Sequence, residues 1–292
     1  MKKGDKVGLV CCSNAQMVSQ KENIDALEAA LRNIGLIPVF SDYIYEKDSV
    51  FGGTAKERTK ALMDFYEDET IRGIFDISGG DIANEILPFL DFEVIAESDK
   101  LFYGYSDLTT IINAIYTKTG KSSVLYQVRN LIGEHGKKQI SDFSNTILEG
   151  GEELFSFEYR FVQGEQLQGT VVGGNIRCLL KLAGTEYFPD VTDKILFLEA
   201  RSGRVPQMVT FLNQLKQMRV FDNIKGIVLG TFSKMEGTHC VPDIETLVKQ
   251  YAGAKLPMVK TQDIGHGSDS KALLIGRTLD LKKFSGHFSC KL

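Results

Sequence analysis

Apolar runs alternate with amphipathic segments along the first half of the chain. Residues 7–12, 73–77 and 101–105 are short and almost continuously apolar, which is typical of strands buried on both faces of a parallel sheet. Residues 21–33 and 108–119 carry apolar side chains at helical spacing. Further strand-like and helical runs lie at 37–40, 54–67 and 82–90. This order predicts an α/β unit in which helices cover both faces of a parallel sheet.

The pattern changes after about residue 140. Strand-like runs at 158–162 and 167–172 follow each other closely, and the tail at 273–290 consists of short strands between polar turns. Helices and strands alternate between these at 175–183, 194–198, 205–218, 226–232, 244–251 and 257–261. We therefore predict an N-terminal α/β domain with a flavodoxin-like parallel sheet at residues 1–165. A C-terminal β-rich, barrel-like mixed α/β domain follows at residues 166–292.

The composition excludes several classes of protein. Hydrophobic residues make up 43% of the chain and charged residues 25%, as in ordinary folded proteins. The formal net charge of −4 gives no basic excess for binding nucleic acid or anionic lipid. The apolar run near Met1 is too short for a secretory signal, and no segment reaches the ~18 apolar residues that span a bilayer. We expect a cytoplasmic protein without nucleic-acid or membrane partners.

The five cysteines show neither the spacing of a zinc site nor a disulfide framework. We interpret them as reduced thiols, with Cys11 or Cys12 at a strand end as an alternative nucleophile. No His-x-x-x-His pattern or dense carboxylate cluster occurs, so no metal site is predicted.

Residues 104–107, Gly-Tyr-Ser-Asp, join a short apolar strand to a helix. A serine on such a turn is carried to the carboxyl edge of the sheet, where ligands of open α/β folds bind. Gly104 leaves room beneath the turn, as in the G-x-S-x-G elbow of serine hydrolases, although the fifth position is Leu108 rather than glycine. Ser106 is therefore a candidate nucleophile. The alternative is that Ser106 only caps the following helix.

A second strand-to-helix turn carries Ser78-Gly79-Gly80-Asp81. Paired glycines allow backbone N–H groups to face a phosphate, a carboxylate or a developing oxyanion. The turn matches neither G-x-G-x-x-G nor the lysine-bearing P-loop, so nucleotide binding is not predicted. The alternative is a tight turn without a ligand.

Two further residues have the chemistry of a catalytic triad. His266 lies between two glycines and is the best candidate for a general base, because imidazole titrates near neutral pH. Glu199 directly follows the apolar run 194–198, so its carboxylate either emerges into solvent or points into a cleft. A serine, a histidine and a carboxylate are the parts of a hydrolytic triad, and the Gly-Gly turn could supply an oxyanion donor.

These residues resemble the LD-carboxypeptidase family of serine peptidases, which includes microcin C immunity proteins. The similar blocks run in family order at 78–81, 86–91, 102–109, 172–175, 182–185, 194–199, 226–230, 265–267 and 274–276. The resemblance implies an N-terminal domain that holds the nucleophile and a β-rich C-terminal domain that holds the other two triad members. It also implies a cytoplasmic homodimer without a cofactor.

Carried over by position, the resemblance makes Ser106 the nucleophile, Glu199 the carboxylate and His266 the base. The backbone N–H groups of Gly80 and Asp107 would bind the oxyanion. Because these residues lie far apart in the sequence, the site would form only when the two domains pack together. The implied substrate is a peptide or muropeptide that is cut before a C-terminal D-amino acid.

The chain departs from the family pattern in segments that we expect to line the pocket. Residues 81–85 replace an aromatic or Ser-Arg stretch, residues 126–129 replace a His-Gly-Pro-like block, and Ala200 replaces an acid. A carboxypeptidase must also hold the free carboxylate of its substrate, for which arginine is the natural partner. Candidates by position are Arg129, Arg177, Arg201 and Arg204, and further substrate-binding candidates are Gly79, Asp81, Tyr105 and Tyr126.

Two alternatives stay open at this point. The first is an immunity-type amidase that acts on peptidyl-nucleotide toxins, with Tyr126 or Tyr105 stacking on the base. The second is a non-catalytic two-domain protein that binds a small anionic ligand at Gly79-Gly80.

Overall fold

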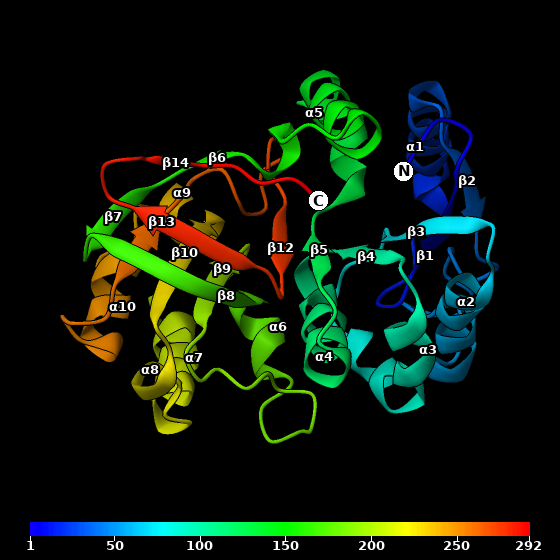
Figure 1. Ribbon diagram of the computed structural model, residues 1–292. Coiled ribbons are helices and arrows are strands. Elements are labelled where there is room, and N and C mark those ends of the chain that lie inside the picture. The colour runs from blue at the N-terminus through cyan, green and yellow to red at the C-terminus, as the bar shows by residue number, and fades with distance from the viewer.

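The computed structural model describes all 292 residues and contains two six-stranded sheets. The first has the strand order β12-β5-β4-β3-β1-β2, in which the five N-terminal strands run parallel (Figure 1). Their bounds are β1 Lys6–Val10, β2 Ile37–Phe40, β3 Ile71–Asp76, β4 Leu101–Gly104 and β5 Ser123–Leu125. The parallel N-terminal sheet that the apolar runs predicted is confirmed.

Helices cover both faces of this sheet because their apolar stripes match its two buried surfaces. On one face α1 and α5 pack against Val7 and Leu9, and on the other face α2 and α4 pack against Val10 and Ile74. The helix bounds are α1 Lys21–Ile34, α2 Ala55–Glu67, α3 Phe92–Glu97, α4 Thr109–Thr119 and α5 Gly136–Glu149. α4 ends at Gly120, whose left-handed φ of 70° is the C-cap that the sequence predicts.

Five short 3-10 helices lie between the longer elements. Their bounds are η1 Val18–Gln20, η2 Ala83–Phe89, η3 Ser106–Leu108, η4 Val128–Ile132 and η5 Glu153–Phe155. The helix predicted at 82–90 is corrected to η2, because Pro88 lies inside it and lacks the N–H that an α-helix needs.

The second sheet has the order β13-β8-β9-β10-β11-β7, with four parallel central strands and antiparallel edge strands. It curls into a half-barrel, which confirms the predicted β-rich second half. The strand bounds are β7 Arg160–Gln163, β8 Gln166–Asn175, β9 Ile195–Ala200, β10 Gly226–Phe232, β11 Met258–Lys260 and β13 Thr278–Lys282. The helices are α6 Ile176–Leu180, α7 Val205–Gln217, α8 Val220–Asn223, α9 Ser233–Gly237 and α10 Ile244–Ala252. A separate small ribbon pairs β6 Phe157–Glu158 with β14 His287–Phe288.

The two halves exchange strands along the chain. β7 precedes residue 165 yet lies in the second sheet, and β12 (Leu273–Ile275) returns to pair with β5 of the first sheet. The division at residue 165 therefore remains a prediction. No helix combines the length and the apolar composition needed to cross a bilayer.

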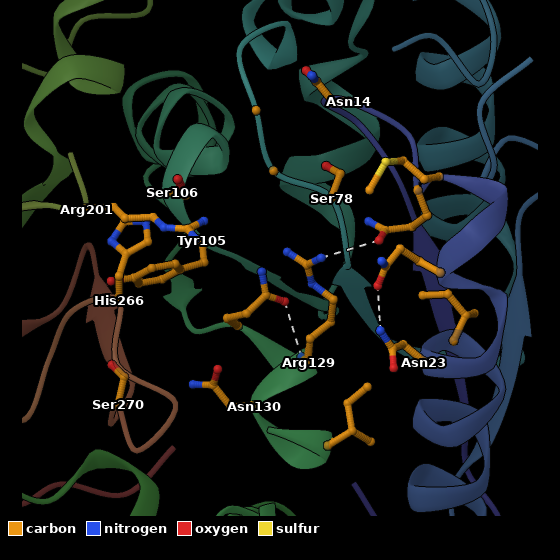
Figure 2. A pocket seen from close by; sticks show the side chains of 18 of the residues that line it. Asn14, Asn23, Ser78, Tyr105, Ser106, Arg129, Asn130, Arg201, His266 and Ser270 are labelled. Carbon is orange, nitrogen blue, oxygen red and sulfur yellow. Dashed lines mark hydrogen bonds between the residues drawn. The ribbon is translucent and has the colours of Figure 1, made fainter. Parts of the chain in front are cut away.

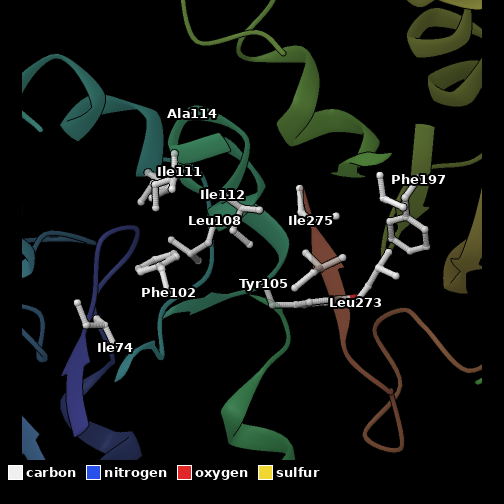
Figure 3. Close-up of a cluster of buried hydrophobic side chains, with 14 of the residues drawn as sticks. Ile74, Phe102, Tyr105, Leu108, Ile111, Ile112, Ala114, Phe197, Leu273 and Ile275 are labelled. Atoms are coloured by element: carbon white, nitrogen blue, oxygen red, sulfur yellow. The ribbon is translucent and has the colours of Figure 1, made fainter. Parts of the chain in front are cut away.

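A shared hydrophobic cluster fixes the two halves against each other. Leu108, Ile111 and Ile112 from the first half lie in the same buried cluster as Phe197 of β9 and Leu273 of β12 (Figure 3). Since burial of a large apolar side chain contributes about 2 kcal/mol, this cluster holds the carboxyl ends of both sheets in one orientation.

Candidate active site

A cavity of about 640 Å³ opens where the carboxyl ends of the two sheets meet. It is lined by the segments that follow β1, β3, β4 and β5 of the first sheet, by the first turn of α1, and by the loops after β9 and β11 of the second sheet. This is the edge at which open α/β folds bind ligands. Figure 2 shows Ser106, Tyr105, His266 and Arg201 gathered on one side of the pocket.

Ser106 lies two residues beyond the end of β4 and has a left-handed φ of 57°. A non-glycine residue rarely adopts this conformation, which is typical of a serine held on a sharp strand-to-helix turn. Gly104 makes the turn possible, because a Cβ there would lie 2.7 Å from the Cβ of Leu108. The N-cap position belongs to Tyr105, and no side-chain hydrogen bond caps this turn. Ser106 thus does not act as the helix cap that was the alternative interpretation.

Glu199 and His266 are joined by a short hydrogen bond. The Nδ1 atom of His266 lies 2.5 Å from Oε2 of Glu199, whose side chain is fully buried. The other carboxylate oxygen, Oε1, accepts a hydrogen bond of 3.0 Å from Nδ2 of Asn175. The carboxylate therefore points into the cleft rather than into solvent, and it fixes the orientation of the imidazole.

The opposite ring nitrogen of His266 is free to act on a ligand. Nε2 is buried and has no hydrogen-bond partner, and His266 lines the same pocket as Ser106. No hydrogen bond joins Ser106 to His266 in this structure. The main-chain N–H of His266 donates to Oγ1 of Thr231 at 3.3 Å, which holds the loop in place.

Tyr105 packs edge-on against His266, with the two ring centroids 4.8 Å apart. Its hydroxyl is buried and makes no hydrogen bond. Burial, together with the nearby Glu199 carboxylate, raises the pKa of the Tyr105 phenol well above its usual value. Tyr105 therefore remains a neutral wall of the pocket.

The Gly-Gly turn presents an unused donor to the same pocket. Gly80 has φ 124°, and a Cβ there would lie 2.2 Å from the Asn14 side chain, so only glycine fits. The Gly80 N–H makes no hydrogen bond within the protein, whereas the Asp81 N–H donates to Oδ1 of Asn14 at 3.0 Å. Below the turn, buried Asp76 accepts from the N–H of Ser78 at 2.7 Å, and burial raises the pKa of this carboxyl.

The carboxylates of Asp81 and Asp107 are engaged away from the pocket. Asp81 is exposed and pairs with Arg177, and it does not line the cavity. The Asp107 carboxylate is fully buried and accepts from Oγ of Ser13 at 2.7 Å, from the N–H of Ala83 at 2.8 Å and from Lys181. Arg177 and Lys181 both come from the second half of the chain, so these contacts tie the two halves together.

The remaining candidates differ in access to the pocket. Gly79, Arg129 and Arg201 line it, but Arg204 does not. Tyr126 also lies outside the lining, since it is buried and its hydroxyl donates to Oε1 of Gln139 at 2.6 Å. Its place beside Phe143 in the core explains why an aromatic residue stands there.

The types of polar side chain that line the pocket were not predicted from the sequence. It contains no Asp, Glu or Lys, its two arginines are Arg129 and Arg201, and side-chain amides dominate its polar groups. These amides are Asn14, Gln16, Gln20, Asn23, Gln127 and Asn130. They lie between the end of β1 and the first turn of α1, and between the end of β5 and η4. The sequence carries no periodic signal that places these two segments side by side. Asn175 was also missed as the partner of Glu199, although it lies within one of the blocks that resemble the family.

The cysteines do not compete with Ser106 as nucleophiles. All five thiols are free, and Cys11, Cys12 and Cys178 are buried. Burial raises the pKa of the Cys11 and Cys12 thiols, which disfavours the reactive thiolate. No group of three or more His, Cys, Asp or Glu side chains is arranged to hold a metal ion.

Comparison with known proteins agrees with this architecture. Residues 7–126 match the model of the LD-carboxypeptidase N-terminal domain, and residues 168–281 match that of the LD-carboxypeptidase C-terminal domain. The chain is 26% identical to the microcin C7 self-immunity protein MccF of Escherichia coli, over 94% of this chain and 89% of that protein. It is 25% identical to a probable murein peptide carboxypeptidase of Bacillus subtilis, over 94% and 88%.

A solved structure of MccF in complex with glutamyl sulfamoyl guanosine superposes with a TM-score of 0.87 at 22% identity. The superposition covers 100% of this chain and 97% of that one, so the whole fold is shared. Together with the two domain matches, which account for most of the sequence, this shows that the chain belongs to the LD-carboxypeptidase family of serine-type peptidases.

Proposed function

We propose that the chain hydrolyses the amide bond before the C-terminal D-amino acid of muropeptides, with Ser106 as nucleophile, His266 as general base and Glu199 as its orienting carboxylate. One observation carries this proposal. Glu199 binds Nδ1 of His266 at 2.5 Å, while Nε2 stays buried and without a partner in the pocket of Ser106. A histidine held in this way presents Nε2 as a proton acceptor.

In the first half of the reaction, Oγ of Ser106 bonds to the scissile carbonyl carbon and passes its proton to Nε2 of His266. The electron pair of the carbonyl moves to its oxygen, and Glu199 stabilises the imidazolium. When the tetrahedral intermediate collapses, the C–N bond breaks, and the released amino acid takes the proton from Nε2. The other product is an ester of Ser106.

Water completes the cycle by the same route. It attacks the ester carbonyl and gives a proton to Nε2, and that proton returns to Oγ as the ester bond breaks. Each intermediate carries negative charge on the former carbonyl oxygen. The free N–H of Gly80 and the backbone N–H of Asp107 are the donors proposed to bind it, and one such donor is worth about 3–4 kcal/mol.

The pocket favours a peptide over a peptidyl-nucleotide substrate. Base stacking needs an exposed aromatic face, but Tyr126 is buried outside the lining and Tyr105 meets His266 edge-on. The side-chain amides instead suit the hydrogen-bonding groups of a peptide backbone. An immunity-type amidase remains the second candidate because MccF is a relative. The non-catalytic binder loses its support, since Ser106 does not serve as a cap.

A direct assay separates these functions. The wild-type protein should release the C-terminal residue of a murein tetrapeptide, and Ser106→Ala should abolish this release. Ser49→Ala is a matched control, because Ser49 is an exposed serine outside the pocket that also has a positive φ, of 51°. An aminoacyl-sulfamoyl adenosine tested in parallel would identify the amidase if only that compound were cleaved. Full activity of Ser106→Ala in a folded protein would eliminate the mechanism.

The family resemblance also leads us to propose a cytoplasmic homodimer. Light scattering of the purified protein would report twice the chain mass if the homodimer forms, and the mass of one chain if it does not.

A further inference from the structure

Arg129 is a cation without a counter-ion in the wall of the pocket. It lies on η4, and its main-chain N–H donates to Oε1 of Gln127 at 3.2 Å, which fixes the start of this helix. The only hydrogen bond of its guanidinium is a long one, 3.3 Å from Nη1 to Oε1 of Gln16. Its Nε is buried and has no partner. Burying a cation without an acidic partner costs free energy. An anionic group of a bound ligand would offset this cost.

No carboxylate of the protein forms an ion pair with Arg129. The lining contains no carboxylate, and the oxygens of nearby Asp76 already accept hydrogen bonds from Cys12 and Ser78. Burial lowers the pKa of the Arg129 guanidinium, the charge of Asp76 offsets part of this effect, and the charge of Arg201 adds to it. An anion bound beside Arg129 would therefore offset both the cost of desolvating the guanidinium and its repulsion by Arg201.

Arg129 also lies at the right place relative to the proposed chemistry. Its Nη2 is 3.8 Å from the position that a Cβ on Gly79 would occupy, and Gly79 adjoins the proposed oxyanion donor Gly80. Figure 2 shows the guanidinium pointing into the centre of the pocket. In a C-terminal substrate, the free carboxylate follows the scissile carbonyl at about one residue's length, ~3.8 Å. The guanidinium of Arg129 therefore lies beside the Gly-Gly turn, next to the place where the scissile carbonyl is proposed to bind.

We infer that Arg129 binds the α-carboxylate of the residue that is released, and that it thereby restricts the enzyme to the C-terminal bond. This rests on the proposed function. The other arginines are less suited to the role. Arg177 is already paired with Asp81. Arg201 also lines the pocket, but it is exposed, and solvent weakens its attraction for an anion. The planar guanidinium of Arg129 can hold both carboxylate oxygens at once.

The test compares a murein tetrapeptide with the same peptide ending in a carboxamide. We expect the wild type to prefer the free acid by about 100-fold in kcat/KM, because a buried charged hydrogen bond is lost with the amide. Arg129→Gln should lower kcat/KM for the free acid by about this factor and change kcat/KM for the amide little, so the preference for the acid disappears. Arg129→Lys should retain part of it. Arg72→Gln, at the far end of β3 from the pocket, should keep the full preference.

Each outcome decides between the two proposals. If Arg129→Gln keeps the preference, or if Arg201→Gln loses it instead, the role of Arg129 is overturned. If the wild type cleaves acid and amide equally, the carboxylate site is overturned while the hydrolase stands. If the wild type cleaves neither peptide and a fluorophosphonate does not label Ser106, the proposed function itself fails. Thermal unfolding checks that Arg129→Gln is folded, and we expect no loss of stability because an unpaired cation is removed.

Discussion

The conformation of Ser106 implies a conflict between stability and activity at one residue. Its left-handed φ of 57° disfavours any side chain, and the cost of this region for a non-glycine residue is about 1 kcal/mol. The same turn also requires glycine at position 104, because a Cβ there would clash with Leu108. The protein therefore retains strain at the position where the proposed nucleophile must be exposed.

Replacing Ser106 by glycine should separate the two effects. We expect Ser106→Gly to increase the free energy of unfolding by about 1 kcal/mol relative to Ser106→Ala, and both variants to lack turnover. Urea denaturation measures the difference. Ser49→Gly serves as the matched control, since Ser49 has a similar φ of 51° outside the pocket, and it should gain stability without losing activity. Equal stability of the glycine and alanine variants at position 106 would contradict the assignment of strain.

At the level of elements, α6 links the two segments that carry the proposed oxyanion donors. Lys181, at the C-cap of α6, donates to the carbonyl oxygen of Asp81 at 2.8 Å and pairs with the buried carboxylate of Asp107. Arg177 on the same helix donates to the carbonyl oxygen of Gly80 at 3.2 Å. These contacts from the second half of the chain thus fix the position of the Gly-Gly turn relative to the turn that carries Ser106.

Lys181→Met should lower both stability and activity. It leaves the fully buried Asp107 carboxylate without its cation, so we expect a loss of about 3 kcal/mol in the free energy of unfolding. We also expect kcat to fall by about 10-fold with KM little changed, because a displaced oxyanion donor acts mainly in the transition state.

Lys118→Met provides the comparison for Lys181→Met. The Lys118–Glu186 pair also joins the two halves, at 2.7 Å, but its side chains are 32% and 67% exposed. An exposed pair contributes less than about 1 kcal/mol, so this variant should remain nearly as stable and as active as the wild type. Equal effects of the two substitutions on kcat would rule out a positioning role for Lys181.

For the whole molecule, local sequence patterns predicted the strands of each sheet better than they predicted how the chain connects the two sheets. The buried strands could be predicted because continuous apolar runs are local features, and the proposed triad residues drew attention because they stand in short local motifs. The return of β12 to the first sheet was not, since three residues carry no signal of their partner. α5 was missed although Ile140, Phe143 and Ile147 show helical spacing.

The placement of the pocket side chains depends on tertiary packing, which explains the remaining differences. Tyr126 was expected to face a substrate but lies in the core, because the sequence shows only that an aromatic residue follows β5. The pairing of Asn175 with Glu199 similarly depends on two neighbouring parallel strands, β8 and β9, whose register is not visible in the sequence.

Buried tyrosines should make the fold sensitive to alkaline pH. Burial raises the phenol pKa of Tyr66, Tyr103, Tyr105 and Tyr126 above the ordinary value of 10.0. Above that pH the unfolded chain loses protons that the folded chain keeps, so stability falls as pH rises, by about 1.4 kcal/mol per pH unit for each group.

Phenolate absorbance during an alkaline titration tests this expectation. The chain has ten tyrosines, so no more than six (10 − 4) should ionise before the circular dichroism signal of the fold is lost. Ionisation of all ten with the fold intact would contradict the burial of these four side chains.

The central claim is that Ser106 is made reactive by His266 across the junction of the two halves. The most direct measurement is peptide mapping by mass spectrometry after treatment with a fluorophosphonate. We predict a single adduct per chain, located on Ser106, and its disappearance in a folded His266→Ala variant. An unmodified Ser106 in a preparation that hydrolyses its substrate, or labelling that is unchanged in His266→Ala, would contradict the account.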